Sequence, residues 1–289
     1  MAEKYNRKLI LEDGSEYYGH AFGADGDKVC EIVFNTSMVG YQEIVSDPSY
    51  TDQAVGMTYP IIGSYGICAD DFETSTPTIG ALIVREYNDE PSNFRSKENL
   101  DALMKRYFIP GIYGIDTRQL TRSIRDIGSR RVLVAGIDTD LEDGLRIIHE
   151  TPVPHDAVQR VSSKEIKEYR AKDEKYRVVL VDCGMKLNIL RSLLGRGCSV
   201  TVVPYNTSPA MIESMCPDAL MLSNGPGDPE DVEEVINTVR SLRGKLPIFG
   251  ICLGHQLIAL ACGARTYSSN SDTGAETIPS EIFLPAKRR

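Results

Sequence analysis

The strongest constraint on the fold is a regular alternation of apolar and amphipathic segments after residue 176. Four apolar runs rich in Val, Ile and Leu occupy 177–181, 199–203, 219–222 and 246–249. Each is followed by a segment with helical periodicity or helix-forming composition, at 187–194, 209–214, 229–242 and 253–262. Strands of this composition are typical of a parallel sheet that helices cover on both faces. Residues 176–289 are therefore predicted to form a doubly wound α/β domain.

The first half of the chain has a different pattern and is expected to form a separate domain. Short β-prone runs alternate with turn residues at 8–11, 31–34 and 78–84. One helix is predicted over 96–107, with Ser96 as its N-cap. A second helix is predicted over 118–127, because the Asp116 carboxylate can accept from N–H groups of its first turn. We therefore predict a mixed α+β domain in residues 1–150.

Between these two parts the apolar periodicity fades. Residues 151–154 are proline-rich, and a charged run follows at 164–175. Such a composition is typical of a connection with a solvated surface helix. A linker is predicted over residues 151–175.

The most informative motif follows the last apolar run, where the sequence reads Gly250-Ile251-Cys252-Leu253-Gly254. This is the pattern of a nucleophile elbow, with cysteine in place of serine, at a strand-to-helix junction. Glycines on either side permit the tight turn, and the positive end of the helix dipole favours a thiolate at Cys252. The alternative is a buried cysteine between two helix-packing glycines.

A second loop, 222–229, ends another predicted strand and holds two glycines around a proline. Both loops are expected at the carboxyl ends of parallel strands, where open α/β sheets bind ligands. The backbone N–H groups of loop 222–229 and the N–H of Leu253 could together stabilise an oxyanion. An ordinary Gly-Pro turn capped by Asp228 is the alternative, and this loop by itself does not decide between them.

Composition excludes several classes of function. The net charge of −9 disfavours a nucleic-acid-binding surface, and no apolar run is long enough for a membrane span or a signal peptide. Seven cysteines without a C-x-x-C pair and four histidines without an H-x-x-x-H spacing predict neither a disulfide framework nor a metal site. We expect a cytoplasmic protein.

With these motifs the chain resembles the class I glutamine amidotransferases and, more narrowly, the small glutamine-hydrolysing subunits of carbamoyl phosphate synthetases. In the first half the resemblance rests on segments 34–43, 47–50, 58–60 and 114–118. In the second half it rests on 182–191 and the two loops. It implies a small-subunit N-terminal domain followed by a class I glutaminase domain.

The resemblance also implies roles for single residues. Cys252 would attack the side-chain amide of glutamine. The family's glutamine-contacting positions correspond to Ser49, Gly225, Gly227, Leu253 and Gln256. From the residues alone, Ser49 is interpreted as a turn serine in preference to a substrate contact, and Gln256 could equally be a solvent-facing polar residue. His255 lies three residues along the helix from Cys252, so a packing or surface role is favoured over that of a base.

The chain departs from the family pattern in one respect. The family supplies a histidine base and a glutamate from an H-P-E motif, whereas no H-x-E occurs in this sequence. Similarity is expected to end near residue 266, which suggests a domain truncated at its C-terminus. Two hypotheses follow: an active glutaminase subunit, or a catalytically inert binding module. Another class I amidotransferase or a γ-glutamyl hydrolase would leave the first 150 residues unexplained.

The resemblance finally implies partners. Ammonia would pass to a large synthetase subunit that makes carbamoyl phosphate for pyrimidine and arginine synthesis. Because the chain has no G-x-x-x-x-G-K-[ST] loop, ATP and Mg²⁺ are expected on that subunit, with no cofactor in this chain.

Overall fold

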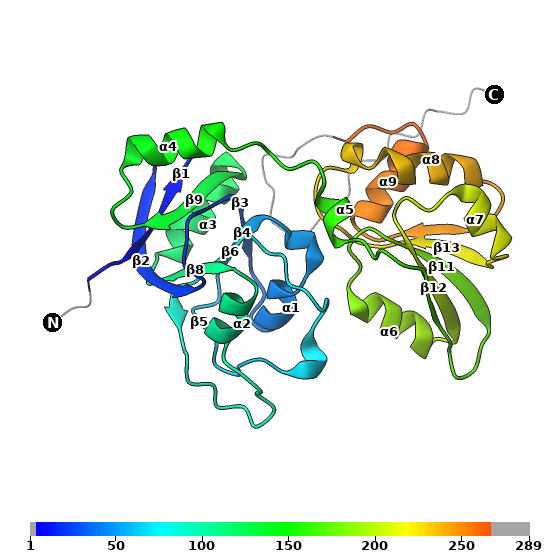
Figure 1. Cartoon of the computed structure of the whole chain (residues 1–289), viewed down its shortest axis with the longest axis horizontal. Helices are drawn as coiled ribbons and strands as arrows, with labels where there is room; N and C mark the ends of the chain where they lie inside the picture. Colours follow the sequence, from blue (N-terminus) through cyan, green and yellow to red (C-terminus); the bar gives the residue numbers. More distant parts are fainter. Residues whose placement is uncertain (1–3, 267–289) are drawn as a thin grey trace. The chain divides into compact units, whose positions relative to one another are not determined.

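A computed structural model describes residues 4–266 of the chain, which divides into two compact units between Val153 and Pro154 (Figure 1). The second unit therefore begins at Pro154. Most of the predicted linker, 151–175, belongs to this unit and contains helix α5 (Ala157–Val161) and strand β10 (Lys167–Tyr169). None of the described helices is long and apolar enough to cross a membrane.

Within its described residues, the N-terminal unit is built around a closed barrel with the strand order β1-β2-β8-β6-β4-β3-β9. The strands are β1 (Arg7–Leu11), β2 (Glu16–Gly23), β3 (Lys28–Asn35), β4 (Gln53–Met57), β6 (Ala81–Ile83), β8 (Pro110–Tyr113) and β9 (Arg130–Gly136). Strand β1 closes the barrel by pairing antiparallel with β9, so that Leu9 faces Val134. The sequence predicted strands here but not their closure.

Two helices of this unit pack against the barrel according to the period-two alternation of its strands. Leu9 and Leu11 lie in one apolar cluster with Leu120 of helix α3 (Thr117–Ile127). Ile10, between them, packs with residues of helix α4 (Leu141–Glu150) instead. Successive strand residues point to opposite faces, which explains the division.

The two predicted helices of this half have different outcomes. Helix α3 is confirmed with its cap, because the Asp116 carboxylate accepts from the N–H of Gln119 over 2.9 Å. Helix α2 (Leu100–Arg106) begins later than predicted, and its N-cap is Asn99. Ser96 as N-cap was wrong, since its hydroxyl donates to the carbonyl oxygen of Glu98.

Shorter elements complete the N-terminal unit. They are helix α1 (Tyr41–Val45), the 3-10 turns η1 (Pro48–Tyr50) and η2 (Ala69–Asp71), and the paired strands β5 (Ile61–Ile62) and β7 (Glu86–Tyr87).

The described part of the C-terminal unit contains a five-stranded sheet in the order β10-β12-β11-β13-β14. Its other strands are β11 (Tyr176–Asp182), β12 (Cys198–Pro204), β13 (Ala219–Leu222) and β14 (Ile248–Gly250). These four are parallel, as predicted, and only the edge strand β10 runs antiparallel. The surface helix expected in 164–175 was wrong, because Lys167–Tyr169 pairs through its backbone with β12, and charged side chains are compatible with an edge strand.

Helices cover both faces of this sheet, which confirms the doubly wound arrangement. On one face Leu180 packs with Leu190 of helix α6 (Leu187–Gly195). On the other, Val179 and Val181 pack with residues of α5, α7 (Pro209–Ser214), α8 (Glu233–Leu242) and α9 (Leu253–Ala261). The 3-10 turn η3 (Pro229–Asp231) precedes α8.

Candidate active site

Cys252 stands at the junction between β14 and α9, in a strained backbone conformation. It is the N-cap residue of α9 and has φ 51° and ψ −113°. A positive φ in a residue with a Cβ atom costs conformational energy and persists only where the surrounding structure enforces it. This is the geometry that the elbow motif predicts for a nucleophile.

The two glycines of the motif are required by the close approach of backbone segments. A Cβ atom on Gly250 would lie 2.4 Å from the carbonyl carbon of Gly254. A Cβ atom on Gly254 would lie 2.5 Å from the carbonyl oxygen of Leu222, at the end of β13. Neither position has room for a side chain, and the tight turn depends on both.

The second predicted loop lies next to the elbow. A Cβ atom on Gly225 would lie 2.8 Å from Cδ2 of Leu253, and Gly227 has a φ of +80° that favours glycine. The N–H of Gly254 donates to the carbonyl oxygen of Ser223 over 3.1 Å. The structure thus brings Gly225 and Leu253 together at the carboxyl edge of the sheet, as expected for parallel strands.

Backbone donors are available at this edge. Leu253 is the first residue of α9, so its N–H has no acceptor within the helix. The N–H groups of the first turn also carry the positive end of the helix dipole. An oxyanion formed beside Cys252 would therefore meet N–H donors and a favourable field.

The other predicted positions are placed as follows. Gln256 donates its backbone N–H to the carbonyl oxygen of Cys252 over 3.1 Å, and its side chain is half-buried. His255 is also half-buried, on the first turn of α9. Ser49 belongs to the N-terminal unit, in turn η1, where its N–H donates to the Asp47 carboxylate over 2.9 Å.

The buried cysteines contrast with Cys252, which is half-buried. Burial raises the pKa of Cys30 to about 12, and it raises the pKa of Cys183 as well. Thiols of this kind stay protonated near neutral pH and are poor nucleophiles. Cys252 is better placed for nucleophilic chemistry than these two residues.

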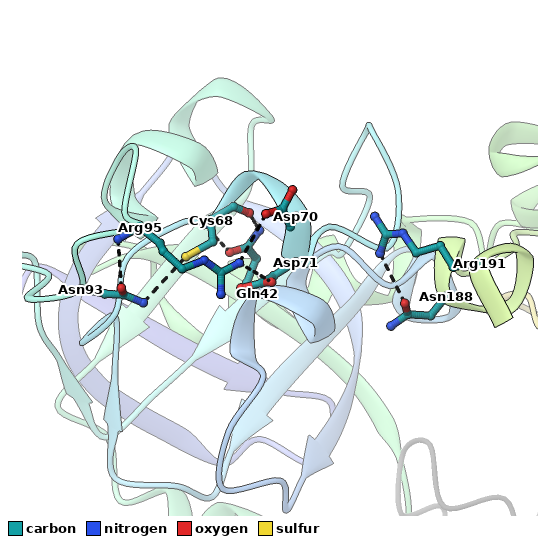
Figure 2. A network of polar contacts seen from close by, with 8 residues as sticks. All are labelled: Gln42, Cys68, Asp70, Asp71, Asn93, Arg95, Asn188 and Arg191. Carbon is teal, nitrogen blue, oxygen red and sulfur yellow. Dashed lines mark hydrogen bonds and ion pairs between the residues drawn. The ribbon is translucent and has the colours of Figure 1, made fainter. Parts of the chain in front are cut away.

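Cys68 is held in the polar network of the N-terminal unit that Figure 2 shows. The Gln42 side chain makes two hydrogen bonds with the Cys68 backbone, of 2.6 and 2.7 Å, and Asn93 Nδ2 lies 3.9 Å from Cys68 Sγ. Burial, followed by the charge of Asp71, raises the pKa of the Cys68 thiol. These contacts indicate a structural role for Cys68.

Sequence reasoning missed one ionisable pair near the glycine loop. His155 Nδ1 lies 2.9 Å from Oδ2 of Asp231, and both line a cavity of about 100 Å³ with Pro226 and Gly227. The two residues are far apart in the sequence, and no motif connects them. Among residues 4–266, no group of three or more His, Cys, Asp or Glu side chains could hold a metal ion.

The doubly wound sheet, the cysteine elbow and the glycine loop define a class I glutamine amidotransferase domain. The family model "Glutamine amidotransferase class-I" matches residues 179–282, beyond the expected end of similarity near residue 266. The model "Carbamoyl-phosphate synthase small chain, CPSase domain" matches residues 9–134.

Relatives extend this match over most of the chain. It is 52% identical over 263 residues to the carbamoyl phosphate synthase small chain of Fusobacterium nucleatum, covering 91% of this chain and 73% of that protein. It is 54% identical over 260 residues to the pyrimidine-specific small chain of Halalkalibacterium halodurans, covering 90% and 71%. The chain belongs to the carbamoyl phosphate synthase small chain family.

Proposed function

We propose that this chain hydrolyses glutamine and delivers the ammonia to the large subunit of a carbamoyl phosphate synthase. The observation that carries the proposal is the strained Cys252 at the N-terminus of α9, with the Gly225 loop against Leu253. The family match supports it, and the relatives' names imply a large chain as partner.

In the proposed reaction the Cys252 thiolate attacks the side-chain carboxamide carbon of glutamine. The carbonyl π electrons move to oxygen, and the N–H of Leu253 and those of the Gly225 loop stabilise the resulting oxyanion. When the tetrahedral intermediate collapses, the C–N bond breaks, its electron pair stays on nitrogen, and the nitrogen takes up a proton from water and leaves as ammonia. Water then hydrolyses the glutamyl thioester, releasing glutamate and the thiol.

Substrate contacts are proposed from the family correspondence. Gly225, Gly227 and Leu253 would bind the reacting amide through their backbones, and Gln256 and Ser49 would contact the rest of glutamine. ATP and Mg²⁺ would bind the large subunit, and the product would serve pyrimidine and arginine synthesis. The name "pyrimidine-specific" of two relatives supports the first pathway.

A second candidate is an interaction module without turnover of its own, favoured by the absence of an H-x-E motif from the 289 residues. Glutaminase assays on the chain with its large subunit separate the two functions. Turnover that Cys252→Ser abolishes supports the glutaminase. Stable binding to the large subunit, with no turnover in the parent chain or in Cys252→Ser, supports the module. A catalytic triad without its base is expected to lose about 10³-fold or more in rate.

A further inference from the structure

We propose that Asp182 and Ser223 are positioning residues for the glutaminase reaction. Together they tie three backbone segments to one another: the turn 183–186, the glycine loop 223–228 and the elbow 250–254. The inference rests on the proposed function, because it concerns the same site. Nothing in the sequence motifs singles out these two side chains.

Ser223 bonds to all three segments. Its hydroxyl accepts from the N–H of Cys183 over 2.9 Å and donates to the carbonyl oxygen of Asn224 over 2.6 Å. Its own carbonyl oxygen accepts from the N–H of Gly254 in the elbow. Ser223 is fully buried, with 0% of its surface exposed, so it cannot contact the substrate.

Asp182 divides its carboxylate between two segments. Oδ1 accepts from the N–H groups of Gly184 and Met185, over 2.9 and 2.8 Å. Oδ2 accepts from the N–H of Ser163, over 2.9 Å, just after helix α5. Hydrogen bonds to an ionised acceptor are stronger than neutral ones, and here three of them converge on one buried side chain.

The turn held in this way supports the glycine loop directly. A Cβ atom on Gly225 would lie 2.1 Å from the carbonyl oxygen of Cys183, and the N–H of Lys186 donates to Oδ1 of Asn224 over 3.0 Å. Turn and loop therefore touch backbone to backbone. A shift of the turn must move Gly225, which lies against Leu253 of the elbow.

Catalysis needs this rigidity because oxyanion donors act only when they are held where the charge develops. A misplacement of about 1 Å can cost about 100-fold in rate. Ser223→Ala would leave the N–H of Cys183 without its acceptor. Asp182→Asn would replace one of the two accepting oxygens with an NH2 group, so either the N–H of Ser163 or those of Gly184 and Met185 would lose their acceptor and the turn would rearrange. We therefore expect Asp182 and Ser223 to affect reactivity without touching glutamine.

The test uses covalent labelling of Cys252 in the full chain, which reads the site independently of turnover. The probe is a chloroketone analogue of glutamine, and iodoacetamide is the reference reagent that needs no glutamine site. Asp182→Asn and Ser223→Ala are compared with Asp218→Asn and Ser199→Ala. Each control side chain also accepts from a backbone N–H: Asp218 from that of Arg177, and Ser199 from that of Ala171. Both of these bonds lie at the amino edge of the same sheet.

We expect the second-order rate of labelling by the analogue to fall at least 10-fold in Asp182→Asn and Ser223→Ala. The iodoacetamide rate at Cys252 should change less than 3-fold, and both controls should match the parent chain. Circular dichroism checks that each variant is folded, and the two variants test the proposal separately.

Two outcomes distinguish the possible failures. If the parent chain is not labelled at Cys252 by the analogue, the proposed function itself is wrong. Normal labelling rates in the folded variants would overturn the positioning role while leaving the glutaminase intact. An equal loss of labelling rate with both reagents and in both controls would do the same.

Discussion

Gly225 and Leu253 are packed so closely that a Cβ atom on the glycine would lie 2.8 Å from Cδ2 of the leucine. The contact joins the loop after β13 to the first residue of α9, where Cys252, the proposed nucleophile, is the N-cap. The same Cβ atom would lie 2.1 Å from the carbonyl oxygen of Cys183, so the loop is enclosed on two sides. A side chain at position 225 would therefore collide with both neighbours.

Gly225→Ala is therefore expected to disrupt both the site and the local fold. Overpacking typically costs about 1–3 kcal/mol of unfolding free energy, and labelling of Cys252 by the glutamine analogue should fall about 100-fold. Gly195→Ala is the matched control, since its Cβ atom would meet nothing within 4 Å at the end of α6. Urea unfolding and labelling rates measure the two effects, and equal behaviour of both variants would contradict this account.

Selective labelling at Cys252 is a second expected outcome. At pH 7.5, peptide mapping after reaction with the analogue should find Cys252 modified and Cys30, Cys68 and Cys183 unmodified, because burial raises the pKa of these three thiols. Excess glutamine should protect Cys252. Labelling of the buried cysteines with Cys252 silent would remove it as the nucleophile.

The stability of the N-terminal unit should fall at alkaline pH because of Cys30. The unfolded chain loses this thiol proton near pH 8.5, whereas the folded chain keeps it up to about pH 12. The folded state thus binds more protons in this window, and the free energy of unfolding decreases as the pH rises, by up to about 1.4 kcal/mol per pH unit for one thiol. Urea unfolding at pH 8 and pH 10 measures the decrease, which should be shallower in Cys30→Ala; an identical slope in that variant would exclude Cys30 as its source.

Asp116→Ala should destabilise the N-terminal unit by about 1 kcal/mol, since the carboxylate accepts from the Gln119 N–H at the start of α3. Asp126→Ala near the other end of the same helix is the control. There a negative charge gains nothing from the helix dipole, so its removal should leave stability within about 0.5 kcal/mol. Thermal unfolding of the two variants tests the difference, and an equal loss in both would argue against capping.

The C-terminal fold was predictable because its signals are local. Each parallel strand is a run of apolar residues, and each following helix has its own periodicity or composition, so the β-α units can be read one at a time. The closed barrel of the N-terminal unit was not predictable, because its closure pairs Leu9 with Val134. No local pattern encodes which distant strands meet. Strand β10 was missed for a related reason, since Lys167–Tyr169 joins the sheet through its backbone and its side chains resemble a solvated helix.

The site shows the same division. The elbow was visible because its glycines stand at fixed spacing around Cys252. Asp182 and Ser223 were not visible, because Asp182 ends β11, Ser223 directly follows β13, and both look like ordinary turn residues. The bond between the Cys183 N–H and Ser223 Oγ spans 40 positions of the chain. Residues that position a site through such contacts become apparent only in three dimensions.

The last prediction concerns the N-terminal unit, which we expect to bind the large subunit. Among its described residues, no group of His, Cys, Asp and Glu could hold a metal, and Cys68 is buried in a structural network. Its closed barrel has an apolar core of its own, so the fragment 1–153 is expected to fold independently.

We predict that this unit, which the small-chain family model matches over residues 9–134, is the interaction module for the large subunit. Interfaces of standard size bury roughly 1,600 Å² in total, which a domain of this length can supply. Size-exclusion chromatography of fragment 1–153 with a cognate large subunit should give a complex, while fragment 154–289 should bind more weakly. If folded 1–153 does not bind although the full chain does, the main interface lies in the C-terminal unit, and its doubly wound domain would have to serve both the glutamine site and the docking surface.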